Sequence, residues 1–290
     1  MSNRHYPNLS PADLQPGDWG LTLGRSEISK LVAWVGDSLY SHAFLMLDQD
    51  HLIEAAPGGV RIVPIAQRMA ETSLLLFDVY RPGNGQGQRY NAQEVRAIQA
   101  KARSFLRRGY PLPELLLLGL MSAMRNWLPE NDTLRWILRI ALEALIRDDP
   151  TELVCSELIF RTLREAEVQP KGDLEPSIVN PARTHAAMPP IDFVALIREL
   201  EQLFPKHGTA DGDVAAMLHA SVHAAYLDRG PISDSTLQAS AEAVRARYAI
   251  ETPKRGVFII PRPNPKAIFP SDLERSPSVR FIGRMHLSRD

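Results

Sequence analysis

Apolar and polar positions fall into short periodic stretches over the first third of the chain. They alternate from Trp19 to Leu23, which predicts a strand. Apolar residues then recur at helical spacing over 26–36, where Ser26 is suited to cap the helix and Gly36 to end it. The same reasoning predicts further strands at 58–65 and 73–82 and a helix at 91–109.

Two strongly apolar runs, "HAFLML" and "HLIEAA", flank the polar triplet "DQD" and predict a β-hairpin. If Leu47 pairs with His51 across that turn, position 44 faces position 54. His42 and Glu54 then share one face of the sheet as diagonal neighbours. A slip of one residue would place them on opposite faces, so the turn decides the geometry.

The most apolar part of the chain lies at 112–148, and Pro129 divides it into a predicted helical hairpin of 114–128 and 132–148. Neither half has the roughly 18 uncharged apolar residues that a membrane-spanning helix needs. Two interpretations stay open. The hairpin packs on the core, or it forms a lid that faces lipid or substrate.

An amphipathic helix is predicted to follow Pro150, with Thr151 as its cap and Cys155 in its first turn or so. Downstream of residue 190 the pattern changes to mainly helical. Three helices are predicted there, and two β-like runs close the chain, at 191–204, 212–228, 233–249, 256–263 and 278–287.

Composition narrows the function classes. The 290 residues are 44% hydrophobic, enough to bury a sizeable core. With 33 basic and 34 acidic residues the net charge is -1, which removes the bulk-electrostatic case for a nucleic-acid partner. The first 20 residues lack the apolar core of a signal peptide. The cytoplasm is therefore the default location, and export by a route without a cleaved signal is the alternative.

Cys155 is the single cysteine, which excludes a disulfide within the chain and a Cys-rich zinc site. A lone cysteine is either an inert buried side chain or a thiol nucleophile. The positive end of a helix lowers the pKa of a thiol, and the N–H groups of that turn can stabilise an oxyanion. A neighbouring imidazole is the second device that lowers a thiol pKa.

His42 is the best candidate for that imidazole among the eight histidines. It alone combines a strand position with a carboxylate on the paired strand, and Glu54 there could hold one tautomer of the ring. His219 and His223 have metal-ligand spacing but lack the glutamate of the zinc-protease helix motif, and we read them as a polar helix face. Tyr110, after a basic helix end, is a candidate neighbour of the cleft. No metal and no cofactor is expected.

Four motifs in order, "GDWGLTLG", "SLYSHAFLML", "HLIEAAPGGV" and "VCSELIF", resemble the circularly permuted papain-like hydrolases, the YiiX-like branch of the NlpC-type superfamily. In that branch the His strand precedes the Cys helix, as His42 precedes Cys155 here. The lecithin:retinol acyltransferase-like proteins share the order, but "YSH", "IEA" and "CSEL" fit the YiiX-like branch better. The resemblance covers about 16–85 and 95–185.

The resemblance implies a role for each site residue. Cys155 would be the nucleophile, His42 the general base and acid, and Glu54 the group that orients His42. Tyr40 would contact the substrate or its oxyanion. The implied fold is an α+β, permuted papain-like domain over 1–189 with a small antiparallel sheet. Two segments depart from the family: a helical insertion at about 112–148, longer than the usual connection, and the extra segment 190–290. Residues 190–290 would form a mainly helical C-terminal extension.

Three function classes follow. The first is a thiol-dependent amidase or peptidase that cleaves cell-wall peptides or another amide through an acyl-enzyme. The second is a lipid acyl hydrolase or acyltransferase, favoured by the apolar hairpin at 114–148, which would then contact a membrane surface. The third is a non-catalytic binding protein. A secreted antibacterial toxin with an immunity protein as partner would fit either of the first two.

Overall fold

The computed structural model describes 6–35, 38–110, 151–180, 195, 258–260 and 263–287. The predicted helical hairpin at 112–148 and the three helices predicted between 190 and 250 lie outside these residues, apart from position 195. So do His219 and His223.

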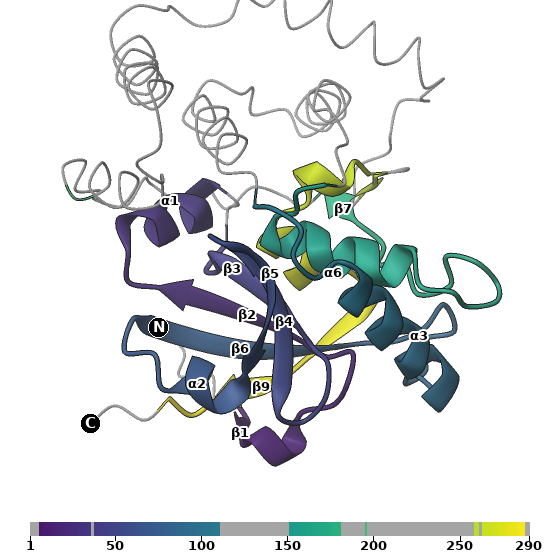
Figure 1. The fold of residues 1–290 in the computed structure, drawn as a ribbon, viewed down its shortest axis with the longest axis horizontal. Helices are drawn as coiled ribbons and strands as arrows, with labels where there is room; N and C mark the ends of the chain where they lie inside the picture. Colours follow the sequence, from purple (N-terminus) through teal and green to yellow (C-terminus); the bar gives the residue numbers. More distant parts are fainter. Residues whose placement is uncertain are drawn as a thin grey trace, which may run out of the picture.

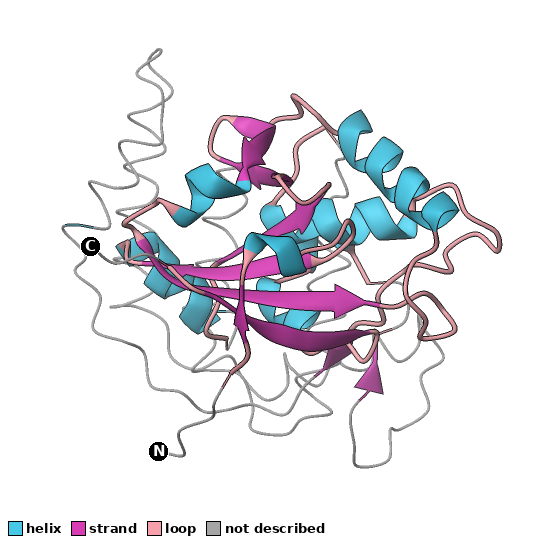
Figure 2. Ribbon diagram, turned by 90° about the horizontal axis from the view of Figure 1, so that it is seen from below, coloured by secondary structure: helices cyan, strands magenta, loops and turns pink. Residues whose placement is uncertain are grey.

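Seven strands form one twisted sheet in the order β1-β9-β6-β2-β3-β4-β5 (Figures 1 and 2). Neighbouring strands run antiparallel except β1 and β9, which are parallel. A separate pair, β7 and β8, is also antiparallel. The strands are β1 (Asn8–Leu9), β2 (Trp19–Gly24), β3 (His42–Met46), β4 (His51–Ala56), β5 (Gly59–Pro64), β6 (Leu74–Pro82), β7 (Val179–Asn180), β8 (Phe258–Ile259) and β9 (Val279–Met285).

Helices lie against both faces of the sheet. On one face α6 packs on β3 and β4, with α3 beside it. On the other face, residues of α2 join Phe44 and Phe77 in a second buried cluster. The helices are α1 (Glu27–Val35), α2 (Ile65–Met69), α3 (Ala92–Ser104), α6 (Cys155–Arg164) and α10 (Pro270–Glu274), with short 3-10 turns at η1 (Pro11–Asp13) and η3 (Pro265–Ala267).

The sequence signals explain where α1 and α3 begin. The Ser29 N–H donates to Ser26 Oγ at 3.0 Å, so Ser26 caps α1 as predicted. At α3, the Asn91 side chain accepts from the N–H of Glu94 at 3.0 Å, and the Glu94 carboxylate accepts from the Asn91 N–H at 2.7 Å. This reciprocal capping box fixes the start of a helix whose Ile98 and Ala102 are buried.

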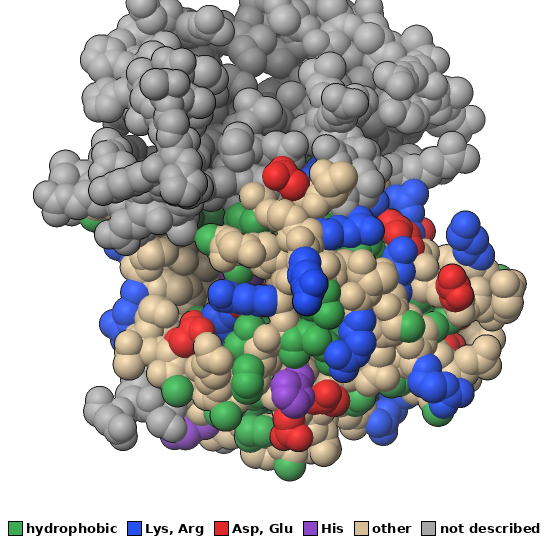
Figure 3. Space-filling model, in the orientation of Figure 1, with side chains coloured by type: hydrophobic (Ala, Val, Ile, Leu, Met, Phe, Trp, Pro, Cys, Tyr) green, Lys and Arg blue, Asp and Glu red, His purple; other side chains and the backbone are tan. Residues whose placement is uncertain are grey.

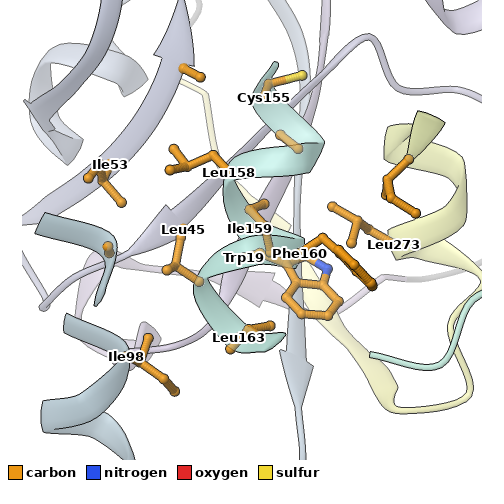
Figure 4. Close-up of a cluster of buried hydrophobic side chains, with 14 of the residues drawn as sticks. Trp19, Leu45, Ile53, Ile98, Cys155, Leu158, Ile159, Phe160, Leu163 and Leu273 are labelled. Carbon is orange, nitrogen blue, oxygen red and sulfur yellow. The ribbon is translucent and has the colours of Figure 1, made fainter. Parts of the chain in front are cut away.

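Helix α6 is enclosed on all sides, since every residue from Cys155 to Leu163 is buried. Its apolar side chains enter the larger core cluster, and Figure 4 shows Cys155 at the first turn with Leu158 and Leu163 further along. The buried Glu157 is matched within the helix, because Arg161 Nε donates to its carboxylate at 2.7 Å. The nucleophile candidate therefore sits on a rigid, fully packed element.

The sheet is larger than the small one predicted, because the end of the chain joins it. The β-like run at 278–287 is confirmed as β9, which lies between β1 and β6. The run at 256–263 contains β8, as predicted. Segment 263–287 also packs on α6 through η3 and α10. This part of the predicted C-terminal extension is thus continuous with the sheet and core rather than separate from them.

The described surface carries both charge signs. Lys and Arg side chains are spread over the face drawn in Figure 3, with Asp and Glu between them. None of the helices in the described ranges has the length and apolarity to cross a membrane.

Candidate active site

The predicted register of the hairpin is confirmed. Leu45 pairs with Ile53 and Met46 with Leu52, and the Leu47 N–H donates to the His51 carbonyl at 2.9 Å. This is the pairing that places position 44 opposite position 54. The "DQD" turn therefore fixes His42 and Glu54 on the same face.

His42 and Glu54 meet where the two strands separate. The ladder between β3 and β4 ends at Leu45 and Ile53, although both strands run on beyond these residues. At this open end His42 Nε2 lies 2.8 Å from Glu54 Oε2. Nε2 is thereby occupied, and Nδ1 is the ring nitrogen left for a second hydrogen-bond partner.

Cys155 lies in the first turn of α6, as predicted, and is the first residue of that helix. The predicted cap, Thr151, is instead part of an extended segment that pairs with Gly109: the Gly109 N–H donates to the Thr151 carbonyl at 3.1 Å, and the Leu153 N–H donates to the Gly109 carbonyl at 2.9 Å. The helix cannot begin until this pairing ends, and Val154 becomes its N-cap. The shift places the sulfur closer to the positive end of the helix dipole than predicted.

The structure brings the Cys155 thiol to His42. Burial alone would raise the pKa of Cys155, but a hydrogen bond to His42, the charge of that ring, and the N–H groups of Ala43 and Ser156 lower it. The Ala43 N–H is available because the strand ladder stops before it: the register would have paired Ala43 with Ala55. The opening between the strands thus supplies a donor to the sulfur.

The imidazole is held in its charged form. Burial works to lower the pKa of His42, but hydrogen bonds and charges from Cys155 and Glu54 raise it to about 9. Burial likewise works to raise the pKa of Glu54, but His42, Arg68 and Arg61 lower it to about 2. At neutral pH His42 is therefore an imidazolium and Glu54 a carboxylate, and the charge of the imidazolium favours the thiolate of Cys155.

Two arginines complete the surroundings of Glu54, and the sequence analysis did not identify them. Arg61 Nε donates to Glu54 Oε1 at 2.9 Å, and Arg68 Nη2 donates to Glu54 Oε2. Arg61 was within reach of prediction, because it lies opposite Glu54 in the β4–β5 ladder. Arg68 lies on the short helix α2, and no periodic pattern pointed to it.

Two tyrosines were named from the sequence. The Tyr40 hydroxyl donates to Asp78 Oδ2 at 2.7 Å and lies 3.0 Å from the Tyr80 hydroxyl, and burial raises its pKa far above the usual value. Its role toward substrate stays a prediction. Burial and then the negative charges of Cys155 and Glu54 raise the pKa of Tyr110, so its phenol is neutral and within electrostatic reach of both groups.

No protein-family model matches the chain, and no curated protein matches its sequence. The crystal structure of the metalloprotein YiiX from Escherichia coli O157:H7 is similar over 93% of this chain and 97% of the YiiX chain, with 14% identity and a TM-score of 0.42. A likeness at that level carries no conclusion about the site. Among the residues described here, no group of three or more His, Cys, Asp or Glu side chains is arranged to hold a metal ion.

Proposed function

We propose that the chain is a cysteine hydrolase that works through an acyl-enzyme, with an amide or peptide bond, such as that of a cell-wall peptide, as its substrate. The observation that supports this is the contact of a buried thiol at a helix start with an imidazole whose far nitrogen is held by a carboxylate. Such a chain of nucleophile, base and orienting group is the arrangement that nucleophilic catalysis requires. The order of His42 before Cys155 fits the permuted branch that the motifs resemble.

The proposed reaction has two halves. The Cys155 thiolate attacks the carbonyl carbon, and the imidazolium of His42 gives its proton to the leaving amine as the C–N bond breaks. Neutral His42 then takes a proton from water, whose oxygen attacks the thioester and releases the acid and the thiolate. Glu54 keeps the ring oriented and stabilises its charged form in both halves.

The oxyanion of each tetrahedral intermediate would be stabilised at the start of α6. The Cys155 N–H belongs to the first turn, where backbone donors have no acceptor within the helix. Together with the helix dipole it provides a positive field beside the sulfur.

A lipid acyl hydrolase or acyltransferase is the second candidate, favoured by a specific observation. The apolar segment 111–150 leaves the described fold after Tyr110 and re-enters it at Thr151, and its two ends are joined through Gly109 and Glu152. Cys155 follows that junction after three residues. An apolar insertion rooted so close to a nucleophile suits a substrate with an acyl chain.

Turnover assays on two substrates separate these candidates. The purified chain would be incubated with peptidoglycan fragments and, separately, with phospholipid vesicles. New amines and carboxylates from the fragments are expected, and release of fatty acid without peptide cleavage would replace the amidase by the lipid hydrolase. Cys155→Ala is expected to abolish either activity, because no other group in the proposed mechanism can form the acyl-enzyme. Full activity in that variant would overturn the cysteine mechanism, and binding without turnover would favour a non-catalytic protein.

A further inference from the structure

Arg68 is a buried cation that the proposed mechanism does not use. Its side chain is 9% exposed, whereas that of Arg61, the other arginine on Glu54, is 54% exposed. Arg68 Nη1 donates to Glu71 Oε2 at 2.7 Å while Nη2 donates to Glu54 Oε2. The guanidinium also lies 5.9 Å from the centre of the Phe44 ring. Packing and two ion pairs fix it in one orientation.

Arg68 and His42 bind the same oxygen of Glu54. Glu54 Oε2 accepts from both His42 and Arg68, while Oε1 accepts from Arg61. A carboxylate bound at both oxygens cannot rotate, so the direction of Oε2 toward the imidazole is set by the two arginines. Arg68 and His42 are therefore linked through one shared oxygen, whereas Arg61 binds the other oxygen.

The way Arg68 is bonded argues against a purely structural role. Its Nε is buried and has no hydrogen-bond partner within the described part of the chain, which costs stability. A buried arginine kept for structure would be expected to satisfy its whole fork, as Arg81 does with both Nε and Nη2 on Asp18. Arg68 instead spends its donors on two separate carboxylates.

We propose that Arg68 is a positioning residue that keeps Glu54 ionised and aimed at His42, and so sets the pH at which Cys155 becomes a thiolate. The proposal rests on the proposed cysteine site. Charged and titratable groups from several elements surround the His42–Cys155 pair. Glu54 contacts His42 and is itself surrounded by Arg61 and Arg68, Arg68 also binds Glu71, and Tyr110 interacts electrostatically with the thiol. Because Tyr110 stays neutral, the other four groups set the net charge around the site.

Both routes of action have the same sign at the thiol. Loss of Arg68 removes a cation that helps to keep Glu54 ionised, and a less ionised Glu54 stabilises the imidazolium of His42 less. It also frees Glu54 to turn away from His42, which destabilises the imidazolium that the thiolate needs. Either change raises the pH at which Cys155 ionises. Removal of the Glu71 carboxylate should lower the pH at which Cys155 ionises, because the charge of Arg68 is then shared by one carboxylate, Glu54, instead of two.

The test is alkylation by iodoacetamide across pH, with the full chain and no substrate. The thiolate forms the C–S bond and iodide leaves with the C–I electron pair, so the rate follows the thiolate fraction, and Cys155 is the only thiol. Arg68→Met is expected to move the acid midpoint up by about one pH unit, so that alkylation below that midpoint slows by about tenfold. Arg68→Lys keeps the charge and should recover part of the shift.

Controls decide between the proposal and its alternatives. Arg81→Met removes from Asp18 an arginine whose side chain is 13% exposed, and it should leave the midpoint in place. Glu71→Gln, at a side chain 32% exposed, should lower the midpoint by a few tenths of a unit. It serves as the test if Arg68→Met does not fold.

Two results would overturn the role of Arg68. The first is an unchanged midpoint in folded Arg68→Met. The second is an unchanged or raised midpoint in Glu71→Gln. If the wild-type midpoint itself lies near that of an ordinary thiol, at about 8.5, the ion pair fails and the proposed function falls with the role of Arg68. If the wild-type midpoint is below that of an ordinary thiol and Arg68→Met does not move it, only the role of Arg68 is overturned and the proposed function stands.

Discussion

Glu54 and Asp18 are two buried carboxylates of one sheet region, and they are neutralised in different ways. Asp18 receives both of its charged hydrogen bonds from a single guanidinium, since Arg81 donates from Nε and from Nη2 at 2.7 Å each. Glu54 divides its two oxygens among Arg61, Arg68 and the ring of His42. Asp18 is 1% exposed and Glu54 0%, so burial does not distinguish them.

The pKa shifts of the two carboxyls have opposite signs. At Asp18 burial dominates and raises the pKa in spite of Arg81. At Glu54 burial is the largest single influence as well, yet His42, Arg68 and Arg61 together lower the pKa to about 2. A fork from one arginine satisfies the geometry of a carboxylate and holds two parts of the fold together. At Glu54 the three cations are Arg61, Arg68 and the titratable His42. They keep the carboxylate ionised, and His42 links it to the thiol of Cys155.

The largest expected contrast is in activity. Glu54→Gln should reduce turnover by about 10²–10⁴-fold, because the amide neither orients His42 correctly nor stabilises its charged form. Asp18→Asn should leave turnover per folded molecule within about twofold, since Asp18 contacts no member of the site. Initial rates on the substrate identified above, normalised to folded protein, check both.

The contrast would be broken by either of two outcomes. A Glu54→Gln enzyme with wild-type turnover would mean that His42 needs no orienting group. A loss of the same size in Asp18→Asn, with its circular-dichroism spectrum intact, would mean that the Asp18 pair supports the site in a way that its contacts do not reveal.

The Asp18–Arg81 pair should matter to the stability of the fold, although it should not matter to turnover. Arg81→Met leaves a buried carboxylate without its cation and is expected to reduce the free energy of unfolding by about 3 kcal/mol. Urea denaturation measures this, and the alkylation midpoint of Cys155 serves as the functional control. A loss under about 0.5 kcal/mol would show that Asp18 is neutralised by protonation instead, in line with its raised pKa.

The pH dependence of turnover should expose the titratable partner of Glu54. The pKa of His42 is raised to about 9, so the imidazolium that protonates the leaving group is present below that pH and lost above it. Turnover is expected to fall as pH rises through about 9. The stabilisation of the fold by this shift follows the same course, being complete below the unfolded-state pKa and lost toward pH 9.

Glu54→Gln should move the alkaline limb of the pH profile, which is the fall in turnover near pH 9, if that limb reports the ionisation of His42. Without the carboxylate, burial lowers the pKa of His42 with only Cys155 to oppose it, and the limb should shift down by about one pH unit. The residual activity of the variant, followed from pH 6 to 10, measures the shift. A limb that stays in place would assign it to a group other than His42.

The local part of this site could be predicted from sequence, and the non-local part could not. The "DQD" turn joins neighbouring strands, so the sequence alone predicts that His42 and Glu54 share a face if Leu47 pairs with His51, and the structure has this register. The start of α6 was predicted at Thr151 and lies at Val154, because Gly109, more than 40 residues upstream, holds 151–153 in an extended pairing. Side-chain capping signals carry no information about such a partner.

Arg68 and β9 show the same limit at two scales. Arg68 belongs to a helix of five residues, too short to leave a periodic pattern, and its partners are set by the tertiary packing of α2 on Phe44. β9 was read correctly as a strand, but its place between β1 and β6 depends on pairing with residues some 200 positions away. Local propensity predicts that a strand forms and gives no information about its neighbours.

The smallest expected effect is at Arg61, and it separates charge from burial within the Glu54 cluster itself. Arg61 lies 2.9 Å from Glu54 Oε1, but its side chain is 54% exposed. Arg61→Met should therefore cost less than about 1 kcal/mol of unfolding free energy, because solvent screens an exposed pair. The acid midpoint of Cys155 should move by less than in Arg68→Met. If Arg61→Met shifted the midpoint as far as Arg68→Met, the cluster would respond to net charge alone, and the shared oxygen Oε2 would have no special part in it.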